Sequence, residues 1–226
     1  MFINRSFQIT CCPPGLASVF SMREAYTDQL ESLFLSLGEV ARKVEVAVQR
    51  ATHALLTGDG DVAESVISSD ISIDRQREEV EESAFLLLSL QQPLAGDLRT
   101  IVAALRIVGE LERMGDLSVH VAKVARLRVP GVAVPDEAVP TISRMAEVAQ
   151  AMVAQVADLL ESRDLKAAKV LVDDDEEMDK LRRDSFTELL GKDWRHGVEP
   201  AVDIALLGRY YERIADHAVS IANRVV

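Results

Sequence analysis

The sequence predicts an all-α protein made of two tandem three-helix bundles. Aromatic residues make up only 4% of the 226 residues, whereas Ala, Val, Leu, Glu and Arg are abundant, a composition typical of long helices. Apolar residues recur at helical spacing along most of the chain. Acidic motifs on the second and third expected helices also recur in a second set of helices, which indicates an internal duplication.

The first bundle is expected at residues 22–128. Three stretches of apolar periodicity lie in it, separated by the glycines of TGDGD and by Pro93, which end helices. These stretches cover about 22–56, 61–91 and 94–127.

The second bundle is expected at residues 141–226, after a linker at 129–140. The linker prediction rests on the stretch RVPGVAVPDEAVP, which holds three prolines and one glycine. The helical pattern then restarts and is interrupted twice, at ESRD and at GKDWRHGVEP. Each half therefore contains three expected helices.

Residues 1–21 are not expected to be part of the fold. We expect a disordered tail or an overlong start, because a helical pattern begins abruptly at Met22. The opening lacks the hydrophobic stretch of a signal peptide. Cys11 and Cys12 are adjacent and have no distant partner, which favours a reducing cytoplasm.

The net charge of −12 favours cations or basic partner surfaces. No Lys/Arg cluster suited to a phosphate backbone occurs in the sequence, which argues against nucleic acid as a partner. No apolar run reaches the length of a membrane span.

Each third helix carries two carboxylates four residues apart, in ELERMGD and in YERIADH. Residues four apart share a helix face, so Glu112 lies beside Asp116, and Glu212 beside Asp216. Each glutamate also interrupts an otherwise apolar row of its helix. We therefore expect it at the edge of the buried face, where an unpaired charge is costly.

Each second helix repeats the four-residue acidic spacing, with Asp70 and Asp74 in the first half and Asp175 and Asp179 in the second. If the second and third helices are neighbours, the acidic pairs converge into oxygen-rich clusters of the kind that hard cations bind. Arginines such as Arg113 and Arg209 stand three residues from a motif carboxylate, so ordinary ion pairs could satisfy the same charge. Spacing alone leaves both interpretations open.

These motifs, together with QQPLAGDLR at the start of the third helix, resemble those of the PhoU family over residues 22–226. The resemblance implies a non-enzymatic cytoplasmic adaptor that links a phosphate ABC transporter ATPase to a sensor histidine kinase and represses the starvation response when phosphate is plentiful. Such a protein is peripheral to the membrane through its partners, and we expect a homodimer.

The resemblance also implies a multinuclear metal cluster, with iron preferred over zinc, manganese or magnesium. Its ligands would be Asp70, Asp74, Glu112, Asp116, Asp175, Asp179, Glu212 and Asp216. In the first half, where fewer acids align, Glu78 and Glu81 could stand in.

Two other functions stay open. A di-metal carboxylate oxidase or ferroxidase would use Glu-x-x-His on facing helices, but neither third helix contains that spacing. A helical scaffold without an ion is the other alternative.

Overall fold

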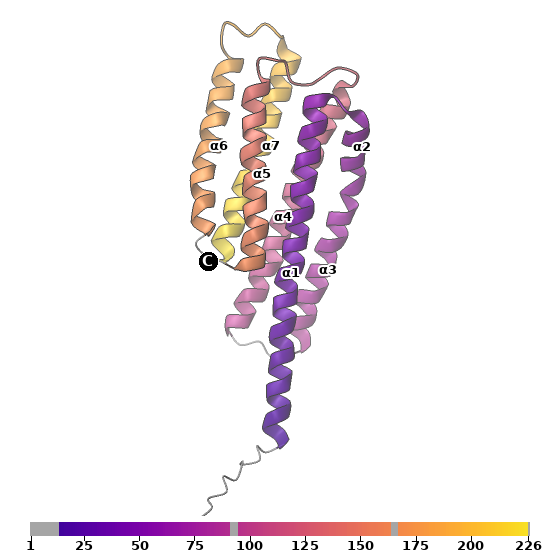
Figure 1. Cartoon of the computed structure of the whole chain (residues 1–226), viewed down its shortest axis with the longest axis vertical. Helices are drawn as coiled ribbons and strands as arrows, with labels where there is room; N and C mark the ends of the chain where they lie inside the picture. Colours follow the sequence, from indigo (N-terminus) through magenta and orange to yellow (C-terminus); the bar gives the residue numbers. More distant parts are fainter. Residues whose placement is uncertain (1–13, 91–94, 164–166, 226) are drawn as a thin grey trace, which may run out of the picture.

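The computed structural model describes residues 14–90, 95–163 and 167–225, and this part of the chain is helical without strands (Figure 1). The predicted all-α class is confirmed, and the second expected helix of the first half is divided in two. In chain order the helices are α1 (Pro14–Thr57), α2 (Gly60–Ser69), α3 (Ile71–Leu90), α4 (Ala95–Arg128), α5 (Val139–Ser162), α6 (Ala167–Leu189) and α7 (Val198–Val225). None of these helices combines the length and apolarity that crossing a bilayer requires.

Helix α1 begins at Pro14, inside the segment that we expected to be a tail. Proline is tolerated in the first turn of a helix, because the N–H that it lacks has no acceptor there. Helical periodicity at Met22 therefore placed the start of this helix too late. The two cysteines lie outside the described residues.

The division between α2 and α3 falls at Asp70. The Asp70 carbonyl accepts the N–H groups of both Ile73, at 2.8 Å, and Asp74, at 3.2 Å, which tightens this turn. Just before it, the hydroxyls of Ser68 and Ser69 donate to carbonyls of the preceding turn, a contact that bends helices. The second half has no such break, since α6 runs continuously through Asp175.

The two sets of helices lie side by side, with α1 against α5 and α4 against α7 (Figure 1). Helices α4 and α7 run antiparallel: Glu110 meets Arg224 near the end of α7, and Arg128 meets Asp203 near its start. Figure 1 shows α1 and α5 running in opposite directions as well. Because each pair joins equivalent helices of the two repeats, an approximate two-fold axis relates the halves.

A single apolar core runs through both bundles. It is made mainly of aliphatic side chains, most of them from α1, α4, α5 and α7, and side chains of α2, α3 and α6 complete it. Its largest fully buried members include Leu37, Leu55, Ile107, Leu111, Met145, Met152 and Tyr211. The two repeats are therefore joined by burial of apolar surface as well as by the linker.

One hydrogen bond inside this core joins the two bundles. The hydroxyls of Thr52 on α1 and Tyr211 on α7 lie 2.8 Å apart, and both residues are buried. Burial raises the pKa of the Tyr211 phenol, and the bond to Thr52 offsets part of that rise. Each hydroxyl supplies the partner that the other needs away from water.

We expect Tyr211→Phe to lower the free energy of unfolding by about 1–2 kcal/mol, because it leaves the buried Thr52 hydroxyl without a partner. Urea denaturation followed by circular dichroism measures the loss. Adding Thr52→Val to that variant removes the orphaned hydroxyl and should recover part of the stability. If Thr52→Val lowered the stability of the Tyr211→Phe variant as much as it lowers that of the unchanged protein, the two hydroxyls would not be coupled, and this result would contradict the pairing.

Candidate metal centre

The first acidic cluster lies where α3 and α4 approach each other closely. Gly115 makes this approach possible: a Cβ placed there would stand 3.2 Å from Cδ1 of Ile73 and 3.7 Å from Oδ1 of Asp70. The absence of a side chain at Gly115 thus gives Ile73 room against α4, and Asp70 lies beside the same position.

The four carboxylates of this cluster act on one another. Burial raises the pKa of Asp70, and the charges of Asp116 and Asp74 raise it further, against a smaller opposing effect of Lys123. Burial and the charge of Asp116 likewise raise the pKa of Glu112. The α2–α3 turn, α3 and α4 therefore hold four negative side chains at a distance where they repel.

The second cluster, between α6 and α7, repeats this arrangement. Burial raises the pKa of Asp175, followed by the charges of Asp216, Asp179 and Glu212. Asp216 and Asp179 are exposed, whereas Glu212 is buried. The structure thus brings together the four acidic residues that the sequence pattern singled out in each half, at a seam between two helices.

Arginines neutralise part of the second cluster. Arg182 donates to Oε1 of Glu212 at 2.6 Å, and Arg209 donates to its other oxygen. Arg183 lies 3.7 Å from Asp179. The ion-pair interpretation therefore applies to the glutamate of this motif.

The donor chemistry of the first cluster fits an oxygen-preferring cation, because all four side chains are carboxylates that repel one another. Within the described residues, no three ligating side chains stand close enough to hold one ion as they are arranged. Ion binding would require the carboxylates to draw closer together. The substitutes considered in the sequence are less suited: Glu81 accepts a hydrogen bond from Arg77 at 2.9 Å, and Glu78 is exposed.

A polar network between the bundles was not predicted from the sequence. Glu110 on α4 binds His217 at 2.7 Å and Arg224 at 2.7 Å, both on α7. Burial alone raises the pKa of Glu110, but the hydrogen bonds from Arg224 and His217 outweigh it, so its pKa lies below the ordinary value. Glu110 stands on the flank of α4 that meets α7, and only the packing of the two halves gives it a partner.

The histidines that follow the two motifs turn to the same interface. His217 binds Glu110, and the His120 ring stacks on Tyr210 with 5.3 Å between ring centroids. Neither interaction is with a carboxylate of the acidic clusters. This agrees with the absence of a Glu-x-x-His pattern from the third helices.

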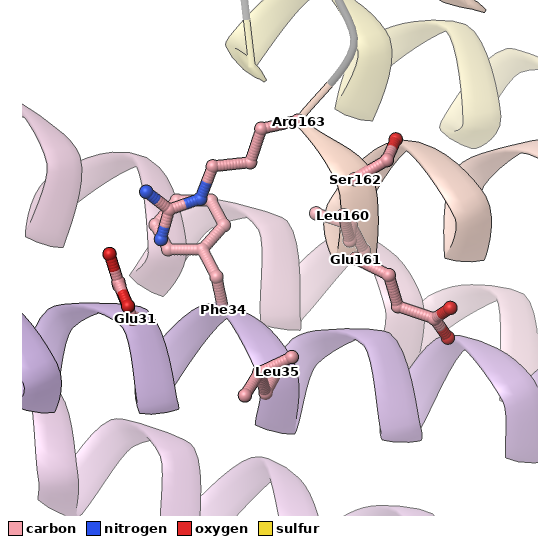
Figure 2. A pocket seen from close by; sticks show the side chains of 7 residues that line it. All are labelled: Glu31, Phe34, Leu35, Leu160, Glu161, Ser162 and Arg163. Carbon is pink, nitrogen blue, oxygen red and sulfur yellow. The ribbon is translucent and has the colours of Figure 1, made fainter.

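A pocket of about 230 Å³ lies elsewhere, between α1 and the end of α5 (Figure 2). The Arg163 guanidinium covers the Phe34 ring at 4.4 Å from its centroid, and Glu31 lies to one side. None of the eight acidic residues lines this pocket. This pocket is therefore separate from the acidic clusters.

Comparison with known proteins identifies the repeat. The family model of the PhoU domain matches twice, at residues 37–125 and 142–225. This chain belongs to the PhoU family. The two matches fall within the two halves expected from the sequence, at the offsets that align their motifs, so the duplication is one of whole PhoU domains.

Relatives and solved structures agree with this assignment. The chain is 45% identical over 205 residues to the phosphate-specific transport system accessory protein PhoU homolog 2 of Mycobacterium tuberculosis, covering 91% of this chain and 96% of the relative. It is 31% identical to the PhoU homolog of Rhizobium meliloti, covering 89% and 85%.

Among structures, the phosphate transport system regulatory protein PhoU of Streptococcus pneumoniae superposes with a TM-score of 0.80 at 24% identity, covering 89% of this chain and 95% of that one. PhoU of Pseudomonas aeruginosa superposes with a TM-score of 0.78 at 27% identity, covering 89% and 96%. The all-α architecture of two bundles is thus that of the solved PhoU structures.

Mutual repulsion in the first cluster should lower the free energy of unfolding by a measurable amount. Folding raises the pKa of Asp70, so at a pH just above the ordinary value the folded chain binds more protons at this carboxyl than the unfolded chain does. The contribution of Asp70 to the free energy of unfolding therefore falls as the pH rises. We expect Asp70→Asn to raise the free energy of unfolding at pH 7 by about 0.5 kcal/mol. This gain should disappear below about pH 3, where the carboxyl is largely protonated in both states.

Urea denaturation at the two pH values measures this difference. Asp184→Asn, at an exposed position of α6, serves as the matched control and should change stability little at either pH. A loss of stability at pH 7 in Asp70→Asn would show that the carboxylate is satisfied and not repelled.

Proposed function

We propose that this chain is a non-enzymatic regulator of phosphate uptake and of phosphate-starvation signalling. In this proposal it acts in the cytoplasm as a cation-binding adaptor between a phosphate ABC transporter ATPase and a sensor histidine kinase, and it represses the starvation response when phosphate is plentiful. Its relatives are named as accessory and regulatory proteins of phosphate transport, which supports the regulatory role.

The observation that carries the proposal is the pair of equivalent acidic clusters in a duplicated PhoU domain. Like charges concentrated at a helix seam cost free energy, which a cation or a basic partner surface would recover on binding. Asp116 and Asp216 are exposed beside half-buried or buried glutamates, so a partner can reach both seams. The carboxylates would hold the metal, with iron preferred, and neutralisation of their charge is what the metal would supply.

An oxidase function is less well supported. Di-metal oxidases on helical bundles take histidine as well as carboxylate ligands. Here the two histidines nearest the motifs bind or stack across the interface between the bundles. A scaffold without an ion remains a distinct outcome of the experiment below.

The test replaces the motif carboxylates on the third helices. A strain that lacks its own copy is complemented with the variant in which Glu112, Asp116, Glu212 and Asp216 are changed to Ala. Reporter expression from a phosphate-starvation promoter in phosphate-rich medium should rise to the level of the uncomplemented strain, because neither cation nor partner meets its carboxylates. Circular dichroism should show unchanged helix content.

A control variant removes the same charge elsewhere. The exposed residues Glu79, Glu82, Asp184 and Glu188 lie on α3 and α6 outside the two clusters, and their change to Ala should leave repression intact. Elemental analysis of the native protein, purified under low oxygen without chelators, measures bound metal, and affinity capture from membranes detects the ATPase. Normal repression in the motif variant would refute the adaptor role, whereas lost repression without bound metal would favour the scaffold.

A further inference from the structure

An apolar groove opens between α6 and α7 at the end of the second bundle, where the loop that connects these two helices lies (Figure 1). It has a volume of about 590 Å³, and its larger lining side chains are those of Phe186, Leu189, Leu190, Trp194, Val198 and Val202. Leu190 is 85% exposed and Val198 80% exposed, so the folded chain leaves apolar surface in water here. Apolar surface gathered in this way marks a site where another molecule binds.

The walls of the groove are held in place by contacts within the chain. The Trp194 indole N–H donates to the Gly197 carbonyl at 2.8 Å, which fixes the loop. On α6, the Arg182 guanidinium lies 5.7 Å from the centre of the Phe186 ring and donates to Glu212. A groove with fixed walls loses little conformational entropy when a partner fills it.

The two helical walls determine which secondary structure fits between them. The backbone N–H and C=O groups along α6 and α7 are paired within each helix, so the groove offers no edge to an added strand. A helix satisfies its own backbone and can present apolar side chains at positions i, i+4 and i+7. On α7 the lining residues run from Val198 to Ala205, which is about 10 Å and therefore room for about two turns of a partner helix.

Charge at the loop end of the groove favours an acidic partner. Among the lining residues Arg195 is the only charged one, and within the described part of the chain it forms no ion pair. Lys192 is exposed in the same loop and is also unpaired there, and Asp193 does not line the groove. The chain has 37 acidic residues against 25 Lys and Arg, so the groove is basic although the chain as a whole is acidic.

Charge at the other end limits how far an acidic helix can extend. Arg182 and Arg209 share the single carboxylate of Glu212, so this end also keeps a positive charge. Farther along the same seam, the carboxylates of Asp179 and Asp216 would repel an acidic helix. A helix with acidic residues at both ends of its apolar stripe therefore fits the groove itself and not the rest of the seam.

We propose that the α6–α7 groove binds an amphipathic helix of a partner protein, one whose apolar stripe is flanked by Asp or Glu. This surface lies beside the second acidic cluster but uses other side chains, and it requires the opposite charge from the partner. The inference goes beyond the proposed function and does not depend on a bound cation, so either can fail without the other.

Trp194 is the sole tryptophan of the chain and lines the groove, so its fluorescence reports whether the groove is filled. A synthetic helix of about 14 residues, with Leu at i, i+4 and i+7, Glu at the flanking positions and no Trp, is titrated into the full chain. The emission of Trp194 should shift to shorter wavelength and saturate, because the peptide excludes water from the indole. The same peptide with Lys in place of Glu should bind about tenfold more weakly or worse.

Two substitutions separate the apolar contact from the charge. Val202→Asp should weaken binding of the acidic peptide about tenfold or more, because it places a negative charge in the apolar lining. Val46→Asp on α1 is the matched control, since Val46 is 51% exposed and Val202 50%, and it should leave binding unchanged. Arg195→Glu should reverse the preference between the acidic and the basic peptide, whereas Arg75→Glu on α3 should not. Circular dichroism checks that each variant keeps its helix content.

Photocrosslinking in cells identifies the natural occupant. The photoreactive amino acid p-benzoylphenylalanine, placed at position 190 of the full chain, should crosslink to an acidic helical segment of another protein, and Arg195→Glu should abolish that product. A crosslink to a second copy of this chain, to lipid or to a basic segment, or no crosslink, would overturn the inference. So would the absence of a saturable emission change with the acidic peptide. None of these results bears on repression in the motif variant, which tests the adaptor role separately.

Discussion

Repulsion between carboxylates that the fold does not allow to separate is the constraint on which the surface of this protein depends. Asp70 and Asp116 are held together because Gly115 lets α3 and α4 approach, and both helices are fixed by the apolar core beneath them. Burial and the charge of Asp116 both raise the pKa of Asp70. Packing energy thereby maintains a charge arrangement that would disperse in an isolated helix pair.

The core has the same role at the level of the whole chain. One continuous set of buried, mostly aliphatic side chains joins α1 and α4 to α5 and α7, and polar groups in this seam bind one another across it. The Thr52–Tyr211 pair and the Glu110–His217–Arg224 network are such contacts. They fix how the two PhoU domains sit against each other, which apolar contact alone specifies less closely.

Periodicity and motif spacing predicted the helical class, the duplication and the convergence of each acidic quartet, because these depend on patterns local to a helix. The break at Asp70 was not predicted, since Ser and Asp are compatible with a helix until their side chains bond to the backbone. The start of α1 was placed late because periodicity reports packing and not helicity. The binding partners of Glu110 and of Arg77 could not be predicted either, since both depend on which side chains lie nearby on another helix or on the next turn.

The joining of two PhoU domains in one polypeptide has an evolutionary consequence. If two identical copies of a single domain associated, every substitution would appear in both at once. Here equivalent positions, such as Asp116 and Asp216, are encoded by separate codons, so one half can change while the other is preserved. A fused pair can therefore specialise its members without giving up the interface that symmetry first provided.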